Sequence, residues 1–246
     1  MKRIIFFLIL MMSISVFTFC SDKTKKENTE IKNVKRIDRT NNWITLFDGK
    51  TADGWRGFNS EELPKNWIVE NGTLKSLGKG GDIGGDIVFA DEQFENFELK
   101  LEWKIETGGN SGIFYHVQEG DQYSAPYQNA PEYQIIDQRG FPEKLEPWQS
   151  IAADYGMHNT DKNQLIVKTA GEWNTTRIIF TKERVEHWLN GKKVLEFEPW
   201  SKEWIKKKES GKWKDFPEYG IFKKGLIGLQ DHGSLIWFRN IKIRKL

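Results

Sequence analysis

Cysteine is almost absent from this sequence: Cys20 is the only one among 246 residues. A single thiol excludes an internal disulfide, so the folded part must be held together by its hydrophobic core. A strong charge of one sign is also missing, since the formal net charge is +2, which gives no electrostatic case for a nucleic-acid partner. The sequence contains no HExxH, CxxC, GxSxG, Walker A or dinucleotide glycine motif. These absences argue against the zinc, serine-hydrolase and nucleotide chemistries that such motifs serve.

A long apolar run occurs once, from Ile4 to Phe19, directly after Lys2 and Arg3. This layout is typical of a secretory signal peptide and is too short for a comfortable membrane-spanning helix. The cysteine that ends it resembles a bacterial lipoprotein cleavage site, although Phe19 stands where such sites favour a small residue. We therefore expect residues 1–20 to be a signal peptide, with Cys20 lipidated and the protein anchored to a membrane of the bacterial cell envelope. A plain secretory signal and an uncleaved anchor are the alternatives.

Residues 21–40 contain no aromatic residue and little apolar content, which is typical of a flexible tether. The folded part then begins close to Trp43. A single domain over 41–246 is long enough to bury its own core without cross-links.

Helical periodicity is scarce, and alternating strand patterns fill the folded part. FELKLEWKI (97–105) places apolar residues on one face and charges on the other. Asn71-Gly72 and Asn190-Gly191 each separate two strand-like runs, which predicts two hairpins. The remaining predicted strands are 43–47, 86–90, 112–117, 164–168, 176–181, 225–231 and 234–243. Such a pattern predicts an all-β, two-sheet antiparallel sandwich of the jelly-roll type.

The stretch EYQIID (132–137) carries polar groups within a strand pattern. In a regular strand Glu132 and Gln134 share one face, while Asp137 lies on the other. A β-bulge at Ile135-Ile136 would bring Asp137 to the face of Glu132 and spare the core a buried carboxylate. We predict the bulged form.

Several other polar residues are placed to line a groove. GLIGLQDHG sets Gln230 and His232 on the face of a glycine, where a ligand can approach the backbone. Asn110 lies in the turn before a strand, and His158 lies in a loop, where it serves a turn or a ligand equally well. The isolated His116 and His187 are interpreted as structural. Four tryptophans in loop-like segments are candidates for contacts with sugar rings: Trp148, Trp200, Trp204 and Trp213.

Six segments, taken in order, resemble a bacterial family of secreted 3-keto-glycoside (3-keto-disaccharide) hydrolases, also called 3-keto-glucoside 1,2-lyase/3-keto-2-hydroxyglucal hydratases. They are WITLFDGKTADGW (43–55), WIVENGTLKS (67–76), 94–117, PEYQIID (131–137), 171–198 and GLIGLQDHGSLIWFRNIKI (225–243). The resemblance implies a concanavalin A-like sandwich with a concave, carbohydrate-binding face. It also implies cleavage of glycosides that carry a ketone at C3, by elimination across C1 and C2 followed by hydration.

Such a reaction needs a base at C2, donors for the enolate oxygen and an acid for the leaving group. Glu132 and His232 are the candidate base and acid, in either order, and Asp137 is a further catalytic candidate. The candidates for binding the substrate are Asn110, Gln134, Gln230, Arg239 and His158. No cofactor is required by the sequence. A divalent metal is compatible with Glu132, Asp137 and His232, but no spacing demands it.

Two other functions fit the same fold. The first is a retaining glucanase, whose bulged E-x-D-x-x-E motif EYQIID approaches, although Gln134 replaces the middle acid and the shorter Asp137 the last. Retaining glycosidases need two carboxyl groups about 5–5.5 Å apart, which the shorter side chain makes harder to reach. The second is a carbohydrate-binding lipoprotein without activity. The residues favour elimination over direct displacement.

Overall fold

The computed structural model describes residues 37–38, 42–79 and 85–246. The predicted signal peptide, Cys20 and most of the predicted tether lie outside the described residues. Of that tether, Ile37 and Asp38 form a short strand, β1, which pairs with Trp43 and Ile44.

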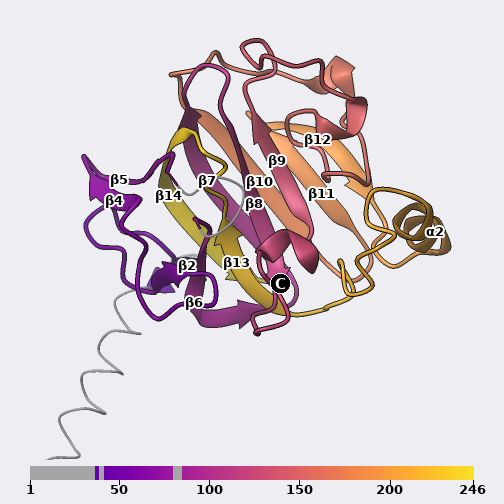
Figure 1. Ribbon diagram of the computed structural model, residues 1–246, viewed down its shortest axis with the longest axis horizontal. Coiled ribbons are helices and arrows are strands. Elements are labelled where there is room, and N and C mark those ends of the chain that lie inside the picture. Colours follow the sequence, from indigo (N-terminus) through magenta and orange to yellow (C-terminus); the bar gives the residue numbers. More distant parts are fainter. Residues whose placement is uncertain (1–36, 39–41, 80–84) are drawn as a thin grey trace, which may run out of the picture. The chain divides into compact units, whose positions relative to one another are not determined.

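Two antiparallel sheets make up almost all of the described secondary structure (Figure 1). The nine-stranded sheet runs in the order β1 (Ile37–Asp38), β2 (Trp43–Thr45), β14 (Leu235–Lys245), β7 (Phe97–Ile105), β10 (Asn174–Phe180), β11 (Val185–Leu189) and β12 (Lys192–Phe197). Beside this path lies the hairpin of β4 (Trp67–Glu70) and β5 (Thr73–Leu77). The five-stranded sheet runs in the order β3 (Trp55–Gly57), β6 (Ile87–Phe94), β13 (Gly225–Leu229), β8 (Asn110–Val117) and β9 (Glu132–Ile136). The predicted all-β, two-sheet sandwich is confirmed.

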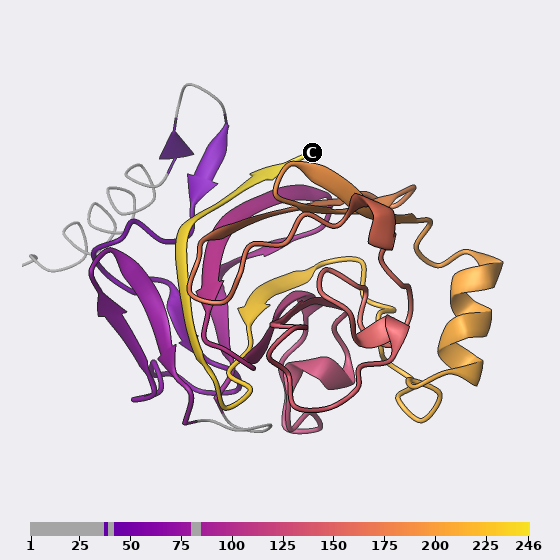
Figure 2. The ribbon, with the colours of Figure 1, turned by 90° about the horizontal axis from the view of Figure 1, so that it is seen from above.

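The larger sheet curves over the smaller one (Figure 2). Successive strands from β5 to β8 alternate between the two sheets, as expected of a jelly roll. Both predicted Asn-Gly hairpins are present, and Asn71 and Asn190 have the positive φ that these turns require.

The core lies between the sheets because each strand buries one face. In β7 the apolar residues of the alternating pattern are buried, and Lys100, Glu102 and Lys104 between them are partly exposed. Phe238 and Trp103 pair across β14 and β7 on the buried side. Full burial of such a side chain stabilises the fold by about 1.5–3 kcal/mol. His116 and His187 also lie in the core, where desolvation lowers the pKa of each to about 4.

The predicted strand at 164–168 is wrong. This segment contains the end of a short 3₁₀ helix, η3 (Lys162–Gln164), followed by irregular chain. Asparagine side chains take the place of a strand ladder: the Lys168 amide donates to Asn174 Oδ1 (3.1 Å), and the Ile166 carbonyl accepts from Asn190 Nδ2 (2.7 Å). Side chains that bond locally to the backbone compete with sheet pairing.

The Trp- and Lys-rich segment 200–224 contains a helix and a pair of stacked aromatic rings. Helix α2 (Lys202–Ser210) begins where the Ser201 hydroxyl accepts a hydrogen bond from the Trp204 amide, which is an N-cap. The chain that follows packs Trp213 against Tyr219, with ring planes 9° apart and centroids at 4.1 Å. This packing brings the segment against the five-stranded sheet, where it forms part of a pocket.

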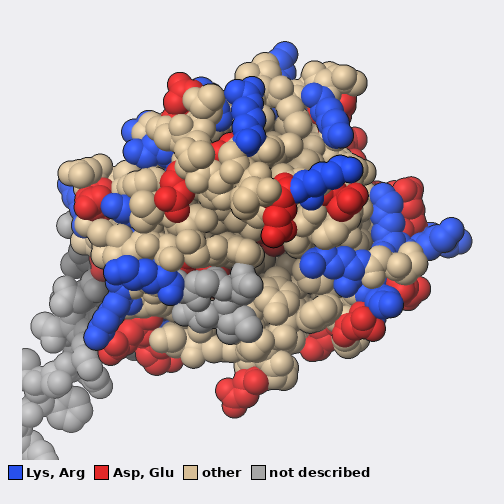
Figure 3. Space-filling view, turned by 45° about the horizontal axis from the view of Figure 1, so that its top comes forward, with Lys and Arg blue, Asp and Glu red and all other residues tan. Residues whose placement is uncertain are grey.

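Charged side chains of both signs are interspersed on the face shown in Figure 3, in keeping with the small net charge. Among the described residues, no helix is long and apolar enough to cross a membrane.

The predicted β-bulge in EYQIID is wrong. Strand β9 pairs with β8 in unbroken register, from Glu132 opposite Phe114 to Ile136 opposite Asn110. Asp137 follows the end of the strand, where its carboxylate accepts hydrogen bonds from the amides of Gly108 (2.9 Å) and Arg139 (3.3 Å). The core is spared a buried carboxylate because the strand ends, so no bulge is needed.

The Asp137→Asn variant therefore tests whether Asp137 stabilises the turn or takes part in catalysis. We expect its turnover to match that of the parent protein. Weakening of the charge-assisted bonds to the backbone should lower the free energy of unfolding by about 0.5–2 kcal/mol. Chemical denaturation and steady-state kinetics measure the two quantities. A loss of turnover with unchanged stability would contradict the assignment of Asp137 to the turn.

Candidate functional site

A cavity of about 330 Å³ opens on the face of the five-stranded sheet that points away from the core. This volume lies within the range of about 300–1,000 Å³ that is usual for small-molecule sites. The floor is built by β8, β9 and the end of β13, and one wall is built by the segment after α2. Its lining residues are Asn110, Tyr127, Glu132, Gln134, Tyr155, Lys212, Trp213, Phe216, Gln230 and His232.

The regular register of β9 sets Glu132 and Gln134 side by side on the cavity floor. Strand β9 ends its sheet, but its edge is covered: the Gln134 amide donates to the Ala153 carbonyl (3.1 Å), and the Tyr155 amide donates to the Glu132 carbonyl (3.0 Å). The covering segment thereby places Tyr155 at the cavity and leaves Glu132 only 3% exposed.

Burial raises the pKa of Glu132 well above its usual value, because the ionised carboxylate would lose its hydration. The negative charge of Asp86 raises this pKa further, and the positive charge of Lys212 opposes the rise. The protonated form of Glu132 is therefore favoured in the folded protein.

Gly112 makes room for the Glu132 carboxyl group. It lies on β8 directly opposite Gln134, two positions from Phe114, which is opposite Glu132, and the carboxyl group leans across it. A Cβ atom at position 112 would lie 2.1 Å from Glu132 Oε1, far inside any contact distance. A glycine is thus needed here for the Glu132 side chain to adopt this position.

Three amide side chains at the cavity have buried oxygens without a hydrogen-bond partner among the described residues: Asn110 Oδ1, Gln134 Oε1 and Gln230 Oε1. Gln134 is 2% exposed and Gln230 is 8% exposed. A buried polar atom without a partner costs about 1–3 kcal/mol, so such atoms are usually satisfied by a ligand or by water. These amides are suited to a ligand that offers several hydroxyl groups.

The turn that carries His232 is fixed by its neighbour Asp231. The Asp231 carboxylate accepts from the Gly233 amide (3.0 Å) and from the Asn66 side chain, while the Asp231 amide donates to Asp86 Oδ1 (2.9 Å). These bonds hold the end of β13 and place His232, which is partly exposed, at the cavity.

Aromatic rings surround Lys212 at the cavity wall. Its ammonium group lies 5.1–5.4 Å from the ring centroids of Trp148, Tyr155 and Trp213. The Trp213 indole donates to the Tyr155 carbonyl (2.9 Å), which ties this wall to the segment that covers β9. A cation and flat rings therefore face the carboxyl and amide groups of the floor.

A family model, the 3-keto-alpha-glucoside-1,2-lyase-like domain, matches residues 42–244. The chain belongs to this family. A curated relative, a 3-keto-disaccharide hydrolase from Bacteroides thetaiotaomicron, is 38% identical over 233 residues, which cover 83% of this chain and 78% of the relative.

Solved structures of two proteins from Parabacteroides distasonis, each described as a proposed glycosyl hydrolase, are also similar. The first is 40% identical with a TM-score of 0.78 and covers 85% of this chain and 95% of its own. The second is 32% identical with a TM-score of 0.63 and covers 84% of this chain and 100% of its own. The resemblance to the 3-keto-glycoside family found in the sequence is thereby confirmed.

Five of the residues predicted for the family's site meet at this cavity, and three do not. The five are Asn110, Glu132, Gln134, Gln230 and His232. Asp137 lies in the turn described above. Arg239 lies on the outer face of the other sheet, paired with Glu102 at 2.8 Å, because Phe238 takes the inward position. His158 is hydrogen-bonded to the buried Asp154 through Nδ1 (2.9 Å) and stacks on Phe197, and it does not line the cavity.

Asp137 therefore does not join Glu132 and His232 in the set of possible metal ligands that the sequence suggested. Within the described parts of the chain, no cluster of three or more His, Cys, Asp or Glu side chains is arranged to hold a metal ion.

The cavity also contains residues that sequence reasoning missed. The missed residues come from segments without a strand pattern; they are Tyr127, Tyr155, Lys212 and Phe216. Of the four tryptophans expected at a groove, Trp213 is the one that lines the cavity. The density of aromatic residues in 200–224 is the signal that marks this segment as a wall.

Proposed function

We propose that this protein cleaves 3-keto-glycosides by elimination and hydration, with Glu132 as the proton donor to the leaving oxygen. The family and the 3-keto-disaccharide hydrolase relative support a glycoside-cleaving hydrolase. The observation that carries the proposal is the cavity floor, where the buried Glu132, whose pKa is raised by burial, lies beside amide oxygens that lack partners among the described residues.

The chemistry follows from the ketone at C3. The hydrogen on C2 is acidic because the ketone stabilises the enolate that its removal leaves. The electron pair of the enolate expels the C1 oxygen, which takes a proton as it leaves, and an enone remains. Water then adds its oxygen to C1 and a proton returns to C2, so that the net reaction is hydrolysis.

Each role is matched to a group in the cavity. A leaving alcohol needs an acid that holds its proton more tightly than an ordinary carboxyl group, and burial raises the pKa of Glu132 in this direction. Imidazole is the side chain most often used as a general base, so we assign to His232 the removal of the proton from C2. The amides of Asn110, Gln134 and Gln230 bind sugar hydroxyl groups, and Lys212 supplies positive charge toward the enolate oxygen.

Direct displacement of the glucanase type fits the cavity poorly. It requires two carboxyl groups about 5–5.5 Å apart. Among the described residues that line the cavity, Glu132 is the only carboxylic acid, and Asp137 is bonded to backbone amides elsewhere. The wall lysine and the amides favour a substrate that develops negative charge on an oxygen, as an enolate does.

Hydrolysis in heavy water distinguishes the two routes. We expect the purified protein to release sugar from 3-keto-trehalose or a 3-keto-aryl-glucoside but not from the parent glucosides. Elimination and hydration should place one deuterium at C2 of the 3-keto-glucose formed, at early times before spontaneous exchange. Mass spectrometry and proton NMR of the product measure this incorporation.

Three results would contradict the proposal. Cleavage of unoxidised glucosides at comparable rates would favour a glucanase, and product that keeps its C2 hydrogen would exclude the elimination. Binding of plain glycans without turnover of any keto-substrate would instead favour a carbohydrate-binding protein.

A further inference from the structure

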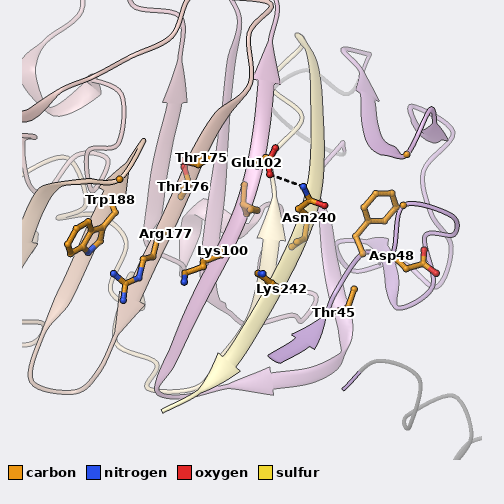
Figure 4. A pocket seen from close by; sticks show the side chains of 16 residues that line it. Thr45, Asp48, Lys100, Glu102, Thr175, Thr176, Arg177, Trp188, Asn240 and Lys242 are labelled. Atoms are coloured by element: carbon orange, nitrogen blue, oxygen red, sulfur yellow. Dashed lines mark hydrogen bonds between the residues drawn. The ribbon is translucent and has the colours of Figure 1, made fainter. Parts of the chain in front are cut away.

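A row of basic side chains crosses the outer face of the nine-stranded sheet. Lys242 of β14 lies opposite Lys100 of β7, Lys100 lies opposite Arg177 of β10, and Arg177 lies opposite Trp188 of β11. Figure 4 shows these four side chains in line across the strands. Residues directly opposite each other on antiparallel strands have Cβ atoms about 4.5–5.5 Å apart, so the positive charges are immediate neighbours.

Repulsion in this row is only partly offset by protein carboxylates. The buried Glu98 forms ion pairs with Arg177 (2.6 Å), Lys100 (3.1 Å) and also Arg244. Within the described chain Lys242 has no carboxylate partner, and its ammonium lies 5.4 Å from the ring centroid of Trp43. The carboxylate of Glu98 is thus shared by three cations, and Lys242 lies beside them as a fourth cation. Like charges placed directly opposite each other destabilise a sheet, and an anionic ligand would supply the missing negative charge.

A hollow of about 630 Å³ lies along the row. Besides the cations it is lined by the ring of Trp188, by the polar side chains of Thr175 and Asn240, and by Asp48, whose carboxylate accepts from the amides of Lys50 and Thr51. Glu102 is already engaged there by Asn240 (2.7 Å) and by Arg239. The hollow therefore offers cations, hydroxyl and amide groups and one aromatic face, which together suit a charged sugar.

We propose that this outer face binds a linear chain of uronic acid sugars, with its carboxylates on Lys242, Lys100 and Arg177. Neighbouring strands lie about 4.7–4.9 Å apart, close to the length that one pyranose ring adds to an extended polysaccharide. The three cations therefore form a line, one on each of three adjacent strands, along which a chain of charged sugar rings can lie. The Glu132 cavity lies on the other sheet, so a bound polymer holds the enzyme near its glycan and takes no part in the reaction.

A flat anionic lipid surface fits this face less well. Trp43 is only 8% exposed and lies beneath Lys100, Lys242 and Arg244, so its ring is not available to enter a bilayer. A flat surface would also leave the hollow unfilled. The large apolar side chains that are most exposed in the described chain do not line the hollow; they are Ile166, Ile205, Ile221 and Leu246.

Calorimetric titration with oligogalacturonides tests the site. We expect a trimer to bind more tightly than the single sugar, the fully methyl-esterified trimer not to bind, and added salt to weaken binding. Lys242→Gln should weaken binding roughly twofold to fivefold, and Lys100→Gln with Lys242→Gln roughly fourfold to twenty-fivefold. Lys223→Gln is the matched control, because Lys223 also lies over a tryptophan ring (Trp200, 5.6 Å) away from the row.

The outcomes decide between the possible ligands independently of any keto-glycoside cleavage. Equal binding of the esterified trimer, or a Lys242→Gln protein that binds as the parent does, overturns the proposal. Lys242-dependent binding to phosphatidylglycerol vesicles without binding to the oligogalacturonide also overturns it, in favour of a lipid surface. Thermal melting of each variant verifies that the fold is retained. A loss of binding without a loss of stability supports binding of the ligand to the row of basic side chains.

Discussion

Replacing Glu132 with Gln is expected to lower the rate of disaccharide cleavage by about 10²–10⁴-fold, the usual contribution of general acid–base catalysis. The amide has nearly the same shape as the protonated acid but has no proton to donate to the leaving oxygen. The loss should shrink below about tenfold for a 3-keto-aryl-glucoside, whose phenolate leaves without protonation. Steady-state kinetics with the two substrates measures this contrast.

The same variant tests whether Glu132 is structural. Its pKa is raised in the folded state, so the folded protein binds this proton more tightly than the unfolded chain does. Stability from this group is therefore complete below the unfolded pKa of about 4.3. It is lost as pH rises from there toward the folded pKa. Glu132→Gln lacks this decline, and at neutral pH we expect it to be more stable than the parent by about 0.5–2 kcal/mol.

Asp137→Asn is the control, since Asp137 lies in the same short segment but outside the cavity. Equal losses for both substrates of Glu132→Gln would reassign Glu132 to the C2 proton, and His232 would then be the acid. A large fall in the free energy of unfolding at neutral pH would show that Glu132 serves the fold.

Gly112→Ala is expected to lower turnover by roughly 10²-fold although it replaces no residue that reacts. The added Cβ would lie 2.1 Å from Glu132 Oε1 and 2.7 Å from Cδ, so the carboxyl group must move away from its place on the floor. A displacement of about 1 Å in a reacting group commonly costs this much in rate. The backbone strain is small because Gly112 lies inside a regular strand without a positive φ.

Gly228→Ala on the neighbouring strand is the matched control for this change. Its added Cβ would meet Phe114 Cβ at 3.3 Å and the Ile87 carbonyl at 3.4 Å, and nothing of Glu132. We expect it to retain most of its turnover. If the two alanine variants lose equal activity, sheet packing and not the position of Glu132 accounts for the loss. Crystal structures of both variants would show whether the carboxyl group has moved.

Local patterns in the sequence were sufficient for the strands and hairpins, because alternation and Asn-Gly turns depend on neighbouring residues. The pattern of 97–105 predicted β7 with its bounds, and both Asn-Gly pairs predicted the hairpins that form. At 164–168 the same reasoning failed, because the side chains of Asn174 and Asn190 bond the backbone of this segment in place of a neighbouring strand.

The sequence by itself determined the all-β sandwich, because strand alternation depends on neighbouring residues, and the family, through the six segments that resemble it. It also supplied the five polar residues that share the cavity as candidates. Only the tertiary structure decided that β9 ends before Asp137 and that Phe238 turns Arg239 outward. It alone also placed Lys212 and Trp213 over Glu132, because these depend on strand register and on packing between segments far apart in the chain. The burial that raises the pKa of Glu132 is likewise a property of that packing.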